Sequence, residues 1–246
     1  MTCDSAFHWN SAARTDVGLV RSRNEDAYLA QPKRGLWAVA DGMGGHAYGD
    51  VASRMVVDAL AMLPAPDNMT RFIFEARECI GGINHDLRIE AAARRVPVMG
   101  STVVALLACG NELACLWAGD SRIYLYRDAR LQQLTRDHSQ AQVLHARSGA
   151  VSSVITRAVG AADTLDLEQA VLNAHDGDML LLCSDGLSNM VDEHGIGAAL
   201  AGGDCAQAAQ VLVALALANG GRDNVTVVVA RADDVYGDRT MHNPAL

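Results

Sequence analysis

The sequence predicts an α+β fold in which β-sheets pack against one another and helices cover them. Two segments with helical spacing come first, a series of short apolar strand candidates follows, and two more helical segments precede a final strand. Gly-Asn and Gly-Asp turns join consecutive strand candidates, as in an antiparallel meander. Separate runs of helices and strands are typical of layered α+β proteins.

The first predicted strand is the apolar run "LWAVAD" at residues 36–41. A helix is expected from Gly49, because apolar residues recur at helical spacing until Pro64 ends it. A longer helix is expected over residues 68–95, with a weak point at Gly81-Gly82. The remaining expected elements are strands at 101–110, 111–120, 121–130, 165–173, 178–185 and 224–232, and helices at 137–149, 192–202 and 204–221.

Length and composition limit the class of protein. The chain has 246 residues, half of them hydrophobic, and no Pro/Gly-rich or charged linker divides it. We expect a single catalytic domain over residues 1–233, followed by a loose tail over 234–246. The formal net charge of −9 argues against nucleic acid as a partner, because proteins that bind it usually carry a basic face.

The sequence contains no apolar run of the ~20 residues that a membrane span needs, so no membrane association is expected. The first residues lack the basic and apolar regions of a signal peptide, which favours a cytoplasmic location, and we expect a monomer. The six cysteines form no C-x-x-C pair, and Cys109, Cys115 and Cys183 lie inside apolar runs. All six are therefore expected to be free thiols.

Aspartates recur where apolar runs begin or end. Asp41 ends "LWAVAD", and Asp120 ends "ACLWAGD". Asp185 ends "MLLLCSD", and Asp223 precedes the last predicted strand. A carboxylate at the edge of a core is costly unless it is paired or bound to a metal, and few basic residues lie nearby. Brought together at one end of a sheet, these groups would bind a hard divalent cation.

Each of these features has a plainer interpretation. Asp-Gly is a common turn, so the pattern alone leaves a metal site and a set of ordinary turns both open. In "GLVRSRNEDAY", Arg21 lies close to Glu25 and Asp26, which by itself indicates a charged surface run. Beside a metal site, the guanidinium would bind phosphate and the carboxylates would orient metal-bound waters.

Eight motifs, taken in order, resemble the PPM (type 2C) family of metal-dependent protein serine/threonine phosphatases in its bacterial form. They cover the chain from about residue 10 to residue 231. The resemblance implies a four-layer αββα sandwich of two antiparallel β-sheets flanked by helices, in agreement with the α+β prediction. The matching segments are "GLVRSRNEDAY", "AVADGMGGHAYGDVAS", "MGSTVVAL", "LWAGDSRIYLYR", "LTRDHS", "VITRAVG", "LLLCSDGLSNMV" and "GGRDNVTVVV".

The resemblance implies a two-metal centre at the matching positions. Asp41 would bridge two Mg²⁺ or Mn²⁺ ions, and the backbone carbonyl of Gly42 would bind the second ion. Asp185 and Asp223 would hold the first ion. Asp120 would help to bind a weak third ion.

The same resemblance implies how a phosphate ester would be hydrolysed. Glu25 and Asp26 would hold waters around the ions, and Arg21 would clamp the substrate phosphate. A water activated by two cations would attack phosphorus directly, so no cysteine nucleophile is needed. The leaving alkoxide needs a proton, and His46 is the candidate general acid. Eukaryotic members carry a histidine directly after the Asp-Gly, where this chain has Met43, so a loop histidine that only tethers the turn remains the alternative.

The chain departs from the family pattern at two places. The segment between "LTRDHS" and "VITRAVG" forms a flap over the substrate groove in the family, and here it is shorter than bacterial members usually have. Asn189 stands where an aspartate is common, so a third ion should bind more weakly. His138, in "RDHS", is interpreted as a structural residue of the loop beside the site.

The predicted function is therefore metal-dependent hydrolysis of phosphoserine and phosphothreonine in proteins, reversing a bacterial Ser/Thr kinase. The expected partners are phosphoprotein substrates, among them such a kinase or an FHA-domain phosphoprotein. One alternative is a catalytically weak pseudophosphatase that acts as a binding module, although the aspartates of the two-metal centre are all present. Another is a small-molecule phosphatase, which the short flap leaves open.

Overall fold

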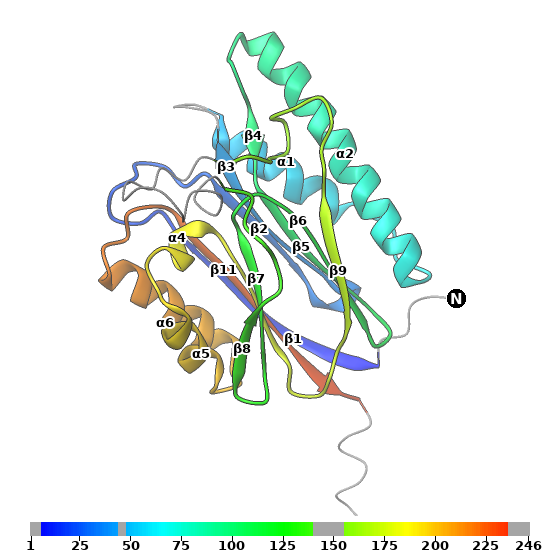
Figure 1. Cartoon of the computed structure of the whole chain (residues 1–246), viewed down its shortest axis with the longest axis vertical. Coiled ribbons are helices and arrows are strands. Elements are labelled where there is room, and N and C mark those ends of the chain that lie inside the picture. Colours follow the sequence, from blue (N-terminus) through cyan, green and yellow to red (C-terminus); the bar gives the residue numbers. More distant parts are fainter. Residues whose placement is uncertain (1–5, 44–47, 140–154, 236–246) are drawn as a thin grey trace, which may run out of the picture.

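Two antiparallel β-sheets pack face to face (Figure 1). The computed structural model describes residues 6–43, 48–139 and 155–235. The first sheet has the strand order β1-β11-β10-β7-β8, and the second has the order β2-β3-β5-β6-β9, with β4 paired to β3. The strands are β1 (Phe7–Asp16), β2 (Asp26–Gln31), β3 (Leu36–Met43), β4 (Gly100–Ser101), β5 (Val103–Cys109), β6 (Glu112–Ala118), β7 (Arg122–Arg127), β8 (Arg130–Gln133), β9 (Glu168–Asn173), β10 (Met179–Cys183) and β11 (Val225–Asp234).

Helices cover the outer face of each sheet (Figure 1). The second sheet packs against α1 (Gly49–Ala61) and α2 (Met69–Arg94), and the first packs against α5 (Glu193–Leu200) and α6 (Cys205–Ala218). A short α4 (Asp185–Ser188) follows β10, and the 3₁₀ turn η1 (Pro32–Arg34) joins β2 to β3. These four layers confirm the predicted αββα sandwich.

The central strands are apolar on both faces because each face meets another layer. In β5, Val103, Ala105 and Leu107 pack with the helices, whereas Val104 and Leu106 pack between the two sheets. All seven residues of β5 are buried. A strand covered on both sides appears as a continuous apolar run, and such runs were recognisable in the sequence.

The helices begin at side chains that bind their free N–H groups. Asn68 accepts a hydrogen bond from the Arg71 N–H at the start of α2, and Asp204 accepts one from the Gln207 N–H at the start of α6. The weak point predicted at Gly81-Gly82 does not interrupt α2, which is continuous over 26 residues. The buried face of α2 packs on the second sheet on both sides of this pair, so packing outweighs the low helix propensity of glycine.

The first two strands, β1 and β2, were not predicted from the sequence. Each lies at an edge of its sheet, and Trp9 is the single fully buried residue of β1. Edge strands present few apolar side chains, so their period-two pattern is weak. Their positions are set by pairing: β1 aligns with β11 over ten residue pairs, from Phe7 opposite Asp234 to Asp16 opposite Val225.

Two predicted segments differ from the structure or lie outside it. The helix expected at 137–149 falls largely outside the described residues, and Ser139 forms an isolated β-bridge with Ile155. The strand expected at 178–185 ends at Cys183, and Asp185 already belongs to α4. The last strand continues through Asp234, one residue into the segment expected as a tail.

The expectation that all six cysteines are free is wrong for Cys109, which is disulfide-bonded. The cysteines at 79, 115, 183 and 205 are free. Burial raises the pKa of the Cys115 and Cys183 thiols to about 12, so neither is a ready nucleophile. Within the described ranges, none of the helices combines the length and the apolar character that crossing a bilayer requires.

Two glycines test how closely the chain at the start of β3 approaches the neighbouring strand β5. Gly35 and Gly110 have the same left-handed φ of 62°, but a Cβ at Gly35 would lie 2.3 Å from the Ala108 carbonyl oxygen, whereas a Cβ at Gly110 meets open space. Gly110→Ala should cost about 1 kcal/mol for the backbone conformation alone. Gly35→Ala should cost at least about 1 kcal/mol more in urea denaturation. If the two variants lost the same free energy of unfolding, the close packing at Gly35 would be contradicted.

Candidate metal centre

The register of the second sheet places two of the predicted site residues side by side. In the antiparallel pair β2–β3, Asp26 lies directly opposite Asp41. The preceding residues of β3, from Leu36 to Ala40, are fully buried, so they fix the position at which Asp41 leaves the core. Apolar burial thus anchors a carboxylate at the polar end of a strand.

The backbone of Asp41 is held at both its polar groups. Its N–H donates to Thr102 Oγ1 at 3.0 Å, and its carbonyl oxygen accepts from the Thr102 N–H at 2.9 Å and from Ser101 Oγ at 3.0 Å. Thr102 Oγ1 is 2.8 Å from Ser121 Oγ, next to Asp120. These bonds leave the Asp41 backbone little freedom to move.

The first sheet brings further carboxylates to the same place. Asp185 follows β10 and begins α4, and Asp223 directly precedes Asn224 and β11. Ser184 Oγ donates to Asp26 Oδ2 at 2.8 Å, so the two sheets are hydrogen-bonded to each other at this point. The structure therefore brings together Asp26, Asp41, Asp185 and Asp223, which come from four separate segments.

Burial and mutual repulsion perturb these carboxyl groups. Burial raises the pKa of Asp26 to about 7, with the charges of Asp185 and Asp223 adding to the effect. Burial also raises the pKa of Asp120 to about 7, again with a contribution from Asp185. The pKa of Asp41 lies well above its usual range, through burial and then the charges of Asp26 and Asp185. The contributions from neighbouring charges indicate that these carboxyl groups lie close enough to interact electrostatically.

Asp185 belongs to the same cluster. Burial and the charge of Asp223 raise the pKa of Asp185, while hydrogen bonding to Asp41 and Asn189 works in the opposite direction. Perturbed carboxyl groups gathered in this way are a common sign of a functional site.

Three of these carboxylates have an oxygen that is buried and has no hydrogen-bond partner, namely Asp26 Oδ1, Asp120 Oδ1 and Asp185 Oδ1. An unpaired buried carboxylate oxygen is costly, and a hard divalent cation is its natural partner. In the part of the chain that the structure describes, no three His, Cys, Asp or Glu side chains form a ready ligand set. The residues fit a cation by donor type, burial and charge rather than by a preformed coordination geometry.

Gly42 lies where no side chain would fit. A Cβ at Gly42 would lie 2.0 Å from the Gly49 carbonyl oxygen, and a Cβ at Gly49 would lie 2.7 Å from the Glu25 carboxylate. The Gly42 N–H donates to the Glu25 carbonyl oxygen at 3.1 Å. This close approach brings Glu25 beside the end of β3, as the resemblance implied. His46 lies outside the described residues.

Arg21 contacts the acidic cluster directly. Its guanidinium Nη2 lies 2.7 Å from Asp223 Oδ2, and this hydrogen bond together with the charge of Asp223 raises the pKa of Arg21. The side chain of Arg21 remains 57% exposed, so it can also reach a ligand in solvent. The structure thus places the predicted phosphate clamp beside the predicted metal ligands.

Asn224 was not recognised from the sequence as a functional residue, yet it organises the site. Its Nδ2 donates to the carbonyl oxygens of Val17 and Arg23, both at 2.9 Å, and its Oδ1 accepts from the Glu25 N–H at 2.8 Å. It therefore binds both ends of the loop that carries Arg21. The only signal in the sequence was its place after Asp223 in "GGRDN".

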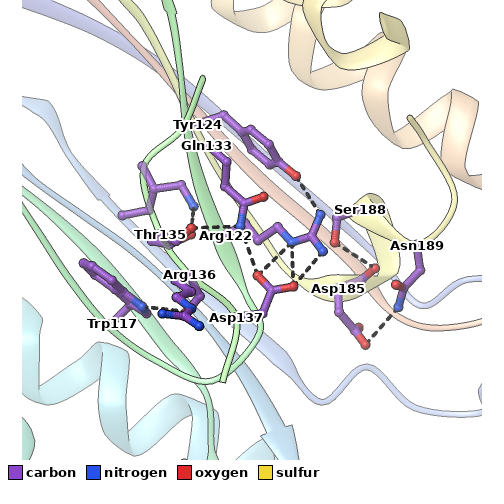
Figure 2. A network of polar contacts seen from close by, with 11 residues as sticks. Trp117, Arg122, Tyr124, Gln133, Thr135, Arg136, Asp137, Asp185, Ser188 and Asn189 are labelled. Atoms are coloured by element: carbon purple, nitrogen blue, oxygen red, sulfur yellow. Dashed lines mark hydrogen bonds and ion pairs between the residues drawn. The ribbon is translucent and has the colours of Figure 1, made fainter. Parts of the chain in front are cut away.

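A second polar network is drawn together with Asp185 in Figure 2. Arg122 binds Asp137 through Nε and Nη2, with the shortest contact at 2.7 Å, and donates to Tyr124 Oη at 2.9 Å. In the same view, Asn189 Nδ2 donates to Asp185 Oδ2 at 3.2 Å (Figure 2). Asn189 thus contacts a proposed metal ligand without adding charge.

His138 is held on both ring nitrogens. Its Nδ1 accepts from the Gly119 N–H at 3.2 Å, its Nε2 lies 3.1 Å from Glu168 Oε1, and the ring stacks on Trp117. A buried ring with both nitrogens engaged has a structural role, which is how the sequence was interpreted.

The pKa shift of Asp120 predicts a pH dependence of stability. Burial raises the pKa of folded Asp120 to about 7, whereas an unfolded aspartate has a pKa of about 4, so between these values folding takes up a proton. Its contribution to the stability of the metal-free protein should therefore fall as pH rises from about 4 to about 7. In EDTA, Asp120→Asn should lose less stability between pH 5 and pH 7.5 than the parent chain. The control Asp58→Asn, at an exposed position on α1, should follow the parent.

Comparison with known sequences points to one family. Residues 20–211 match the family model described as protein phosphatase 2C. The chain is 41% identical over 240 residues to the serine/threonine protein phosphatase PstP of Mycobacterium tuberculosis, an alignment that covers 92% of this chain. It covers 46% of that relative, so the chain spans about half of the relative's length.

Solved structures share the same architecture. One is described as PppA, a key regulatory component of T6SS in Pseudomonas aeruginosa, with a TM-score of 0.86, 44% identity, and coverage of 92% of this chain and 98% of that one. Another is the catalytic domain of PstP in complex with two manganese ions, with a TM-score of 0.80, 39% identity, and coverage of 93% and 100%. The family match over most of the chain, together with the common fold and the acidic cluster, shows that the chain belongs to the protein phosphatase 2C family.

Proposed function

We propose that the chain hydrolyses phosphoserine and phosphothreonine in proteins, in a reaction that depends on divalent cations. The observation that carries the proposal is the buried acidic cluster, with three orphaned carboxylate oxygens, beside an exposed arginine. The similar PstP catalytic domain is in complex with two manganese ions. Mn²⁺ or Mg²⁺ suits this site because its donors are all oxygen atoms.

Five residues would hold the cations. Asp41 would bridge two ions, with the Gly42 carbonyl on one of them, and Asp185 and Asp223 would complete the binding of the other. Asp120, partly screened by Arg122, would help to hold a weak third ion. When bound, such ions lower the pKa of a water molecule and neutralise charge on the phosphoryl group.

The other site residues would bind and orient. Glu25 and Asp26 would accept hydrogen bonds from waters around the ions, with Asp26 held in place by Ser184. Arg21 would bind two phosphoryl oxygens through its planar guanidinium, a geometry that lysine cannot reproduce. His46 remains our candidate for the general acid that protonates the serine or threonine leaving group.

The contact made by Asn189 supports the proposal that a third ion would bind only weakly. Its amide donates to Asp185 Oδ2, so it occupies one carboxylate oxygen and brings no negative charge of its own. An aspartate at this position would offer a nearby cation one more negative charge than Asn189 does. The effect would fall on the third ion, because the proposed ligands of the first two are all present.

The substrates that we propose are phosphoproteins, with a Ser/Thr kinase or an FHA-domain protein among the partners. The short flap segment, which lies outside the described residues, would influence which phosphoprotein is admitted. We further propose that residues 1–233 act as one catalytic unit in the cytoplasm, and that the chain works as a monomer. A role in regulating secretion is suggested by the similar PppA, described as a regulatory component of T6SS.

Asp185→Asn should lower Mn²⁺-dependent hydrolysis of p-nitrophenyl phosphate by at least about 10²-fold, because it removes a charged ligand from the cation. Initial rates across a manganese titration would measure this loss. Asp58→Asn, which removes a carboxylate from the exposed face of α1, is the matched control and should keep the parental rate. Parental activity in the Asp185 variant would overturn the two-metal assignment, and an inactive parent would favour a pseudophosphatase.

Arg21→Lys should raise KM for a phosphothreonine peptide by about tenfold, because lysine keeps the charge but loses the bidentate fork. Arg21→Ala should raise it further. Steady-state kinetics at saturating Mn²⁺ would provide both values. An unchanged KM in the alanine variant would show that Arg21 does not bind the phosphate.

The parent chain should hydrolyse a phosphothreonine peptide with a higher kcat/KM than a sugar phosphate, because a protein substrate can also use the surface around the site. Phosphate release from the two substrates at equal concentration would measure the difference. A preference for the sugar phosphate would instead support the small-molecule alternative.

A further inference from the structure

Two large apolar side chains lie exposed beside the proposed phosphate clamp. Leu19 and Val20 are each 68% exposed, and Arg21 follows them directly in the chain. In the described residues, most other large exposed hydrophobics are separate from one another in sequence. Exposed hydrophobic residues that are scattered singly over a surface are normal and need no explanation. Leu19 and Val20 differ because they are adjacent to each other and next to the proposed active site.

The loop that carries this pair is held in place. The Leu19 N–H donates to the Gly221 carbonyl oxygen at 2.7 Å. The Asn224 side chain binds the carbonyl oxygens of Val17 and Arg23, one on each side of the pair. In Figure 1, the β1–β2 loop lies beside the segment between α6 and β11. Leu19 and Val20 are therefore presented to solvent by an anchored loop.

Charge around the pair favours an anionic ligand. Arg21, Arg23 and Arg222 are all exposed on the two segments that Asn224 joins. The guanidinium of Arg21 also contacts Asp223 of the carboxylate cluster. If a ligand binds its phosphate group at Arg21, the groups next to that phosphate can therefore contact the side chains of Leu19 and Val20.

We propose that Leu19 and Val20 bind apolar side chains next to the phosphorylated residue, and so select phosphopeptides with an apolar residue within two positions of it. Successive residues of an extended peptide rise by about 3.3 Å. Consecutive Cα atoms of the protein are about 3.8 Å apart, so Leu19 lies within about 8 Å of Arg21. A peptide with its phosphate at Arg21 can therefore cover both side chains.

This inference rests on the proposed function, because it names the peptide that the same site prefers. Burying an apolar side chain against Leu19 and Val20 removes apolar surface from water on both partners. The benefit should appear in peptide binding, and hence in KM, since neither apolar side chain has a group that could bind a cation or take part in proton transfer. It should be absent for p-nitrophenyl phosphate, which has no flanking residues.

The test compares two phosphothreonine peptides that differ only in having leucine or serine at the positions flanking the phosphothreonine. The parent chain should show about a tenfold higher kcat/KM for the leucine peptide, carried by KM. In the double variant Leu19→Ser, Val20→Ser, this ratio should fall to within about twofold of one. The single variant Val20→Ser, which keeps Leu19, should give an intermediate ratio.

Met62→Ser is the matched control, because Met62 directly follows α1, is 83% exposed and lies outside the proposed surface. It should keep the parental peptide preference. Binding of fluorescent, non-hydrolysable phosphonate analogues of both peptides, followed by anisotropy, measures the same preference without turnover. An inactive parent that still prefers the leucine analogue would contradict the proposed function while supporting this inference. A parent without preference, or a double variant that keeps it, would overturn the inference.

Discussion

Several carboxylates are held close together where two apolar sheets meet, which costs free energy. The rest of the structure depends on how that cost is offset. Four of these carboxylates border segments that the core buries, namely those of Asp41, Asp120, Asp185 and Asp223. The fold therefore keeps them at the edge of the core. Burial and repulsion raise the pKa of Asp26 and Asp120 to about 7 and shift Asp41 and Asp185 in the same direction. A cation bound to the carboxylate oxygens would offset both the burial of these charges and their mutual repulsion. The site and the fold are therefore best understood together.

The two sheets contribute to the site in different ways. The second sheet provides Asp41 and Asp26 on paired strands, with Thr102 and Ser101 binding the Asp41 backbone. The first sheet provides Asp185 and Asp223 at the ends of neighbouring strands, and Ser184 reaches across to Asp26. The site therefore requires that the sheets pack in one register. The hydrogen bonds from Ser184 to Asp26 and from the Glu25 N–H to Asn224 join the two sheets at this point.

Much of this could be predicted from the sequence, and the parts that could not share a physical cause. Central strands such as β5 are buried on both faces and appear as apolar runs, whereas the edge strands β1 and β2 carry too few apolar residues to be recognised. The aspartates that we propose as metal ligands stood out because they border apolar runs. Asn224 did not, because its role depends on backbone carbonyls about two hundred residues away in the chain. The disulfide of Cys109 likewise left no pattern in the spacing of the cysteines.

The hydrogen bonds of Asn224 have a consequence for how this protein can diverge. One amide binds the loop of Arg21 at both ends and also the backbone of Glu25, while its own neighbour is Asp223. A mutation there would disturb the proposed phosphate-binding arginine, an acidic residue and a proposed metal ligand in a single event. Asn224 therefore connects three parts of the proposed site, although its own amide bonds only to backbone groups of the loop and of Glu25.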